Sequence, residues 1–265
     1  MHAWLVALTL MGPTDTVVDR VPPPSGYTRV PAAAGSFGAH LRALSLKPGQ
    51  PPVRLYDGRE KRNQGAHLAV YALSVGEQDL QQCADSIIRV RADWLRAQSR
   101  DDEICFRFTS GDAASWKRWR NGERPQVKGN RVKWATTAAR DDGERTWREY
   151  LETVFMYAGT YSLRREMTAV ADPRDVRMGD VFIQGGFPGH VVIVVDVAEN
   201  PDGDRVFLLA QGYTPAQDFH LLRNPSSATS PWYRAEDEGE LVTPEWTFQR
   251  ADLRRFPTRA CAGNR

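Results

Sequence analysis

The segment "GDVFIQGGFPGHVVIVVD", residues 179–196, limits most strongly what this chain can fold into. It contains a short apolar run, a turn rich in glycine and proline, and a second run, "HVVIVVD", that is almost wholly apolar. Runs of this length between glycine and proline are typical of strands, and a strand that lacks alternating polar residues is buried on both faces. The segment therefore predicts two strands of a central sheet, the second of them fully buried.

The remaining elements follow from hydrophobic spacing and from turn residues. Strands are expected over residues 66–75, 103–108, 130–137, 181–183, 190–197 and 205–211. Helices are expected over residues 36–46, 79–98, 144–159 and 162–167, with a further short helix inside 109–125. The two long helices precede most of the strand signal, and this order favours an α+β fold with an antiparallel sheet packed against two main helices.

The helix expected over residues 79–98 carries the first candidate for chemistry. Asp79 precedes Gln82 by three positions, which is a capping-box-like start, and the apolar residues that follow recur at helical spacing. In this interpretation Cys83 lies about four residues into the helix, beyond the free N–H groups of the first turn. It also lies on the apolar face, where an inert buried thiol is the commoner case.

Both ends of the chain predict arms outside the main domain. Residues 12–35 are rich in proline, glycine and threonine, which indicates a linker. The preceding segment has an apolar stretch of about ten residues, as in a signal peptide, but it lacks a basic start and a clear cleavage site. Export to the cell envelope and a cytoplasmic location both stay open. We expect an N-terminal arm over 1–25, one α+β domain over 26–256 and a tail over 257–265.

Composition excludes several classes of partner. The 35 basic and 33 acidic residues give a net charge of +2, which offers no argument for nucleic acid or for an anionic membrane. No apolar run is long enough for an integral membrane span. The three cysteines are too few for a disulfide scaffold. Cys83 and Cys105 could pair in an oxidising compartment, whereas Cys261 lies in a polar tail.

The histidine and cysteine positions predict neither a metal nor a cofactor. No two histidines, and no histidine and cysteine, stand at metal-ligand spacing, and the sequence has no glycine-rich phosphate loop. His190 differs from the other histidines because small residues precede it and a buried strand follows it. At the end of a rigid strand it could act as a general base, or it could be a turn histidine bonded to the backbone.

Two residues are candidate partners of His190. Cys83 could be the nucleophile that His190 activates. Gln211, at the end of the strand 205–211, could orient the imidazole if the strand register places both residues on one face, and a slip of one residue would separate them. The alternative for Gln211 is an exposed amide at the strand end. Gln184, Tyr213 and Gln217 are expected as polar groups of the same groove.

Several motifs together resemble a bacterial family called domain of unknown function 4846. They are "LQQCADSIIRVRADWL", "FTSGDAASWKRWRNGERP", "YAGTYSLRREM", "GDVFIQGGFPGHVVIVVD", "LLAQGYTPAQDFHLL", "SPWY" and "TPEWTF". The resemblance covers roughly residues 26–256. It implies a bacterial and often exported protein, and it implies no activity.

The strand motifs also resemble the closing strands of NlpC/P60 cell-wall peptidases, which are papain-like enzymes. That resemblance implies a papain-like core with insertions, His190 as general base and Gln211 as the residue that orients it. The nucleophile of those peptidases is a Cys that opens a helix before the "GD" strand. The similar helix here, "WREYLETVFMYAG", has Trp147 at that position. Either Cys83 takes the role or the site is degenerate.

Three functions remain open. The first is a cysteine hydrolase that cleaves amide bonds of cell-wall peptides with Cys83, His190 and Gln211. The second is a non-catalytic module that binds a peptide or glycan, such as peptidoglycan, on an aromatic-rich rim. That rim would comprise Trp116, Trp119, Tyr213, Trp232, Tyr233 and Trp246, each with core packing as the alternative. The third, which the sequence favours least, is hydrolysis without cysteine, with His190 and either Asp180 or Asp196. Asp180 follows Gly179 at a strand start, as a turn residue does, and Asp196 lies six residues along the strand from His190, about 20 Å, which is too far for a direct partner.

Overall fold

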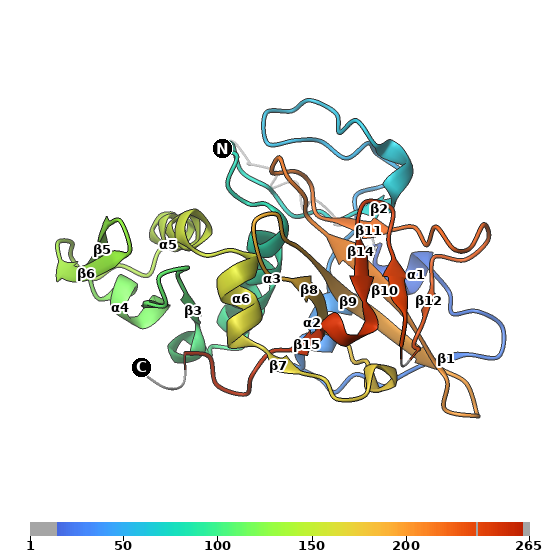
Figure 1. Ribbon diagram of the computed structural model, residues 1–265. Helices are drawn as coiled ribbons and strands as arrows, with labels where there is room; N and C mark the ends of the chain where they lie inside the picture. Colours follow the sequence, from blue (N-terminus) through green and yellow to red (C-terminus); the bar gives the residue numbers. More distant parts are fainter. Residues whose placement is uncertain (1–14, 237, 262–265) are drawn as a thin grey trace, which may run out of the picture.

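The computed structural model describes residues 15–236 and 238–261. The signal-like segment at the N-terminus lies outside the described residues, as do the first residues of the proline-rich stretch over 12–35. The fold is α+β, as expected, and its strands pair antiparallel. Its centre is one large sheet with the strand order β2-β11-β10-β9-β8-β15-β7 (Figure 1).

The bounds of the sheet strands agree with the sequence where the apolar signal is strong. β8 (Val181–Gln184), β9 (His190–Glu199) and β10 (Arg205–Gln211) confirm the three predicted core strands, and β2 (His67–Val70) lies within the range expected for it. The other members are β1 (Thr28–Arg29), β7 (Thr168–Ala169), β11 (His220–Leu222), β12 (Tyr233–Arg234) and β15 (Leu253–Arg255).

Strand β9 lies at the middle of the sheet and is buried on both faces, as predicted. Val191, Ile193 and Val195 belong to the larger apolar core, which also contains helix residues. Val192 and Val194 belong to a second, smaller core on the opposite face. This face is covered by the hairpin of β13 (Glu240–Val242) and β14 (Thr247–Gln249).

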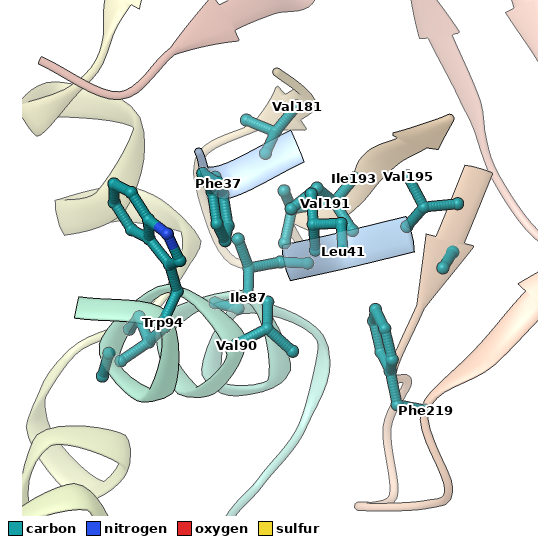
Figure 2. Packing of buried hydrophobic residues seen from close by; sticks show 14 of the residues in the cluster. Phe37, Leu41, Ile87, Val90, Trp94, Val181, Val191, Ile193, Val195 and Phe219 are labelled. Carbon is teal, nitrogen blue, oxygen red and sulfur yellow. The ribbon is translucent and has the colours of Figure 1, made fainter. Parts of the chain in front are cut away.

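Helices α2 (Phe37–Ala43) and α3 (Cys83–Ala97) cover the larger core. Figure 2 shows Leu41 of α2 and Ile87 of α3 between the helices and Val191 of β9. The start of α2 confirms the expected cap, because the Ser36 hydroxyl accepts a hydrogen bond from Ala39 N at 3.1 Å.

The second long helix, α5 (Glu144–Tyr157), confirms the prediction as an element but not its expected place against the sheet. It packs on α3 and on the short helix α4 (Trp116–Arg120). An aromatic cluster explains this position. Trp147 and Tyr150 of α5 contact Trp116 of α4, with ring centroids 5.0 and 5.4 Å apart. Of the two long helices, α3 is therefore the one that packs on the sheet, beside the short helix α2.

Residues 105–157, from β3 to the end of α5, form a lobe beside the sheet (Figure 1). Besides α4 it contains two hairpins. One joins β3 (Cys105–Arg107) to β4 (Ala113–Ser115), and the other joins β5 (Glu123–Lys128) to β6 (Arg131–Thr136). Strand β5 was not expected. The buried aromatic residues of the lobe belong to the same apolar core as β9, so the lobe and the sheet share one core around α3.

The N-terminal arm is less independent than predicted. Residues expected to form a linker contain α1 (Val17–Arg20), whose Val17 is fully buried, and β1, which pairs with the end of β9. The ion pair between Arg29 of β1 and the buried Asp196 of β9 fixes this contact. Glycine and proline content indicated an irregular chain correctly, but it could not show that the chain packs on the core.

The disulfide joins Cys105 and Cys261, and the predicted pair of Cys83 with Cys105 is wrong. The physical reason is position: Cys105 lies in β3 of the lobe, where the end of the chain passes, whereas Cys83 is a free buried thiol at the start of α3. The short helix α6 (Thr160–Glu166) follows α5 and packs on β8. Within the described part of the chain, no helix combines the length and apolarity needed to cross a bilayer.

Candidate functional site

Cys83 is the first residue of α3, and the helix start predicted at residue 79 is wrong. The preceding Gln82 has extended backbone angles, φ −86° and ψ −152°, and its N–H donates to Asp85 Oδ2 at 3.0 Å. Asp79 does not cap α3, because its carboxylate accepts from Ala216 N at 2.7 Å. The thiol therefore lies at the helix start, where backbone N–H groups have no acceptor within the helix.

His190 is the first residue of β9, and its ring is buried. Three aromatic rings surround it: Tyr213 at 4.8 Å, Trp246 at 5.4 Å and Phe248 at 5.9 Å between centroids. Trp246 and Phe248 belong to the second core, so the imidazole lies on the face opposite α2. The following residue, Val191, belongs to the core that α3 covers.

A β-bulge decides that His190 and Gln211 share this face. Between β9 and β10 the register is Leu208 opposite Asp196 and then Leu209 opposite Val194, so β9 carries one extra residue. Without the extra residue, the partner of Gln211 would be Ile193, which faces the helices. With it, Ala210 pairs with Ile193, and Gln211 comes to the face of His190.

The two side chains meet in a short hydrogen bond, 2.7 Å between His190 Nε2 and Gln211 Oε1. Gln211 is fully buried, so this bond is protected from competing water. An amide oxygen only accepts, so Nε2 carries the ring proton and Nδ1 keeps its lone pair. The predicted pair of His190 and Gln211 is thus brought together by the fold.

Two glycines permit the close approach of the elements that carry these residues. A Cβ on Gly212 would lie 2.2 Å from Ser86 Oγ and 2.9 Å from Gln82 O, both in the first turn of α3. A Cβ on Gly189 would lie 2.4 Å from Thr160 Oγ1. Since real Cβ atoms do not approach other atoms so closely, the residues beside Gln211 and His190 need to be glycine for α3 and α6 to pack there.

Cys83 and His190 line one cavity of about 490 Å³. The backbone N–H of Val191, the residue after His190, lies close enough to the Cys83 thiol to lower its pKa. Thr160, Tyr213 and Trp246 also line the cavity, together with the exposed side chains of Met156 and Phe187. The fold therefore places the thiol, the imidazole and an open apolar surface around one space.

Burial keeps both reactive groups uncharged. It raises the pKa of the Cys83 thiol to about 11, an effect to which the nearby Asp85 carboxyl adds, although three backbone N–H groups lower it. Burial also lowers the pKa of His190 to about 4, although the hydrogen bond to Gln211 raises it. At neutral pH both groups that line the cavity are therefore uncharged, the thiol protonated and the imidazole neutral.

The other predicted groove residues have different places. Tyr213 lines the cavity. Gln184 lies opposite His190 in the register of β8 and β9, where its Oε1 accepts from Trp246 Nε1 at 3.0 Å and so holds that ring. Gln217 is buried beside Leu55 and does not line the cavity. Trp119 lies in the lobe, packed between Tyr150 and Arg124.

The expected aromatic rim is largely core. Trp116, Trp119, Trp232 and Tyr233 are each buried, and of the six aromatic residues only Tyr213 and Trp246 line the cavity. The sequence could not separate these cases, because large aromatic side chains are used in both cores and grooves.

The alternative partners of His190 lie elsewhere. Asp196 is buried in ion pairs with Arg29 and Arg42, and Asp180 is paired with Arg255. Trp147, the residue at the position where the peptidase resemblance would place the nucleophile, is in the aromatic cluster of the lobe. Helix α3, not α5, is the helix that starts beside His190.

Sequence reasoning missed the groups behind Gln211. Glu245 and Lys61 form a buried ion pair, and Gln211 Nε2 donates to Glu245 Oε2 at 2.8 Å. His220 lies next to them, 3.3 Å from Gln211 Nε2 through its own Nε2. The one signal for these groups in the sequence was that Glu245 lies in "TPEWTF", one of the motifs that resemble the family. Among the described residues no group of histidine, cysteine and acidic side chains could hold a metal ion.

Comparison with known proteins identifies a family and no activity. No curated protein and no solved structure matches the chain. The model of the family described as domain of unknown function 4846 matches residues 17–255, nearly the whole described chain. The protein belongs to this family.

Proposed function

We propose that the protein is a cysteine hydrolase that cleaves amide bonds of peptides. The observation that carries the proposal is the position of Cys83 at the start of α3, in one cavity with a His190 whose Nε2 is bonded to Gln211. A nucleophile beside a base that a third group orients is the arrangement used for acyl transfer.

The reaction balances with these groups alone and one water. The Cys83 proton passes to Nδ1 of His190 while Sγ bonds to the substrate carbonyl carbon. When the C–N bond breaks, the same proton passes to the leaving amine, and a thioester remains. Water then attacks the thioester with His190 as base, which releases a carboxylic acid and restores the thiol.

Backbone N–H groups at the start of α3 support the charged steps. Those of Cys83 and Ala84 lie close enough to the sulfur to lower the pKa of the thiol. They also have no acceptor within the helix, so they are available to an oxyanion that forms beside Sγ. The positive end of the helix dipole favours the same charge.

The cavity favours substrates with an apolar group beside the scissile bond. Phe187 is 84% exposed and Met156 is 56% exposed, although both are large apolar side chains. Asp79 and Asp85 also line the cavity, and none of its described lining residues is Lys or Arg. The resemblance to NlpC/P60 peptidases makes cell-wall peptides the first class to test, and the Cys105–Cys261 disulfide fits an oxidising compartment such as the cell envelope.

The test is hydrolysis of a panel of fluorogenic peptide amides and of purified cell-wall stem peptides. We expect turnover by the wild type and a loss of at least about a thousandfold in both Cys83→Ser and His190→Ala. Gln217→Ala serves as a control outside the cavity. When it is folded, it should hydrolyse the substrate at the wild-type rate. Turnover that survives in Cys83→Ser would contradict the proposal.

Binding without turnover is the competing outcome. In that case a ligand of the panel would bind with the same Kd to wild type and to Cys83→Ser, and no product would form with either. Four of the six residues expected to form the aromatic rim are core, so the rim on which this alternative was based does not form as a single surface.

A further inference from the structure

The amide of Gln211 lies between His190 and a buried polar cluster formed by Lys61, His220 and Glu245. Its Oε1 is 2.7 Å from His190 Nε2, and its Nε2 donates to Glu245 Oε2 at 2.8 Å. A side-chain amide can turn by 180° and exchange its oxygen for its nitrogen, which are nearly the same size. The direction of this amide decides which nitrogen of His190 holds the proton.

Two acceptors face the nitrogen end of the amide. Glu245 is a carboxylate in an ion pair with Lys61, and a carboxylate only accepts hydrogen bonds. The second acceptor is His220 Nε2, at 3.3 Å. The other nitrogen of His220, Nδ1, is 2.8 Å from the carbonyl oxygen of Asp218, so Nδ1 carries the proton and Nε2 keeps its lone pair.

We propose that Glu245 and His220 are positioning residues for His190: they fix the direction of the Gln211 amide and thereby keep His190 Nδ1 unprotonated and ready to accept the thiol proton. If the amide turned, its NH₂ group would face His190, the ring proton would move to Nδ1, and the base would be lost. This inference deepens the proposed function, on which its catalytic meaning rests.

Lys61 makes Glu245 necessary for this direction. Lys61 Nζ and Gln211 Nε2 bind the same oxygen of Glu245, so the ammonium group lies close to the amide. Both members of the ion pair are buried, with side chains 6% and 10% exposed. Without the carboxylate, the lysine would attract the oxygen of the Gln211 amide and favour the turned direction.

The experiment measures the proton position directly, by ¹⁵N NMR of histidine-labelled protein, with His190→Ala for assignment. Wild type should show one tautomer of His190, protonated at Nε2. In Glu245→Leu we expect a substantial population protonated at Nδ1 and a fall in kcat/KM of at least about tenfold. Glu245→Gln keeps an oxygen toward Lys61 and should restore the wild-type tautomer.

Asn63→Ala is the matched control. Asn63 donates to the other oxygen of Glu245, Oε1, at 3.3 Å, so the variant removes a bond of Glu245 without touching the Gln211 amide. It should keep the wild-type tautomer and rate. A wild-type His190 protonated at Nδ1 would overturn the inference, whatever Glu245→Leu does.

An unchanged tautomer in a folded Glu245→Leu would overturn it as well. The tautomer is read without any substrate, so it separates this inference from the proposed hydrolysis. A tautomer that changes as expected in a protein without turnover would support the positioning role and contradict the hydrolase.

Discussion

His190 is the residue on which the proposed chemistry depends most, because its surroundings fix both its charge and its proton position. Burial keeps it neutral, with a pKa lowered to about 4, and the bond to Gln211 leaves Nδ1 free. Cys83 is equally dependent on its neighbours, since burial raises its pKa to about 11. A neutral thiol has to lose its proton during the attack. It therefore needs a correctly placed base more than a pair that already starts as a thiolate does.

The lowered pKa of His190 predicts activity that persists into acid. Below its pKa the ring is protonated at both nitrogens and cannot accept the thiol proton. We therefore expect kcat/KM to fall as the pH drops through about 4, and not through the ordinary value of 6.5. The measurement is a pH profile of kcat/KM on an uncharged substrate, with circular dichroism at each pH to confirm folding. An acidic limb near 6.5 would show that the imidazole is more solvated than described.

At the scale of the elements, the site depends on where α3 starts and on the register of β9 and β10. Both are set by contacts outside the elements themselves. The Asp79 carboxylate is engaged by the distant Ala216 N–H, which leaves Cys83 as the first residue of α3. The bulge in β9 lies at Asp196, whose buried carboxylate holds Arg29 and Arg42.

Gly212→Ala should separate α3 from the end of β10. The added Cβ would meet Ser86 Oγ at 2.2 Å and the backbone oxygen of Gln82 at 2.9 Å, so the helix start has to move. We expect a loss of about 1–3 kcal/mol in the free energy of unfolding, measured in urea, together with loss of hydrolysis. Gly65→Ala is the control, because its Cβ would meet only Asn63 Oδ1, at 3.6 Å. Equal effects of both variants would argue against the close contact.

Asp196→Ala tests the bulge. The substitution leaves two partly buried guanidinium groups without their partner, which costs about 3–5 kcal/mol of unfolding free energy for a buried pair. The exposed pair of Asp57 and Arg59 offers a comparison, and Asp57→Ala should leave the urea midpoint unchanged. If Asp196→Ala is as stable as wild type, the bulge does not depend on this carboxylate.

These two features mark the limit of what the sequence could predict. The core strands were predictable because "HVVIVVD" is apolar at consecutive positions, and His190 stood out because small residues precede it. The exact start of α3 was not predictable. Asp79 and Gln82 together resemble a helix cap, whereas in the structure the Asp79 carboxylate accepts a hydrogen bond from Ala216 N. The register was left open because a bulge has no pattern in an all-apolar strand.

At the scale of the whole molecule, α3 joins two parts, the central sheet and the lobe formed by residues 105–157 (Figure 1). The apolar core runs without a break from Trp116 in the lobe to Ile193 in the sheet. The disulfide adds a covalent link between the same parts. Cys105 belongs to β3 of the lobe, and Cys261 follows β15, a strand of the sheet. The position of Cys83 relative to His190 thus rests on both parts.

Removing the disulfide should lower the stability of the whole protein. The bond closes a loop with a sequence separation of 156 residues, and a native disulfide of this kind contributes about 2–5 kcal/mol. We expect Cys261→Ser to have a lower urea midpoint than wild type. Reductant should lower the wild-type midpoint to that of the variant and leave the variant unchanged. A wild-type midpoint that does not respond to reductant would contradict this role.

The central claim is that Cys83 is a nucleophile activated by His190. The most direct test is the formation of a covalent acyl-enzyme with an activated ester that carries an apolar acyl group, followed by intact-mass and peptide-mapping mass spectrometry. Cys83 is the one free thiol, since the other two cysteines form the disulfide. We expect one acyl group on Cys83 in wild type and none in His190→Ala. Acylation at another residue, or at an equal rate without His190, would contradict it.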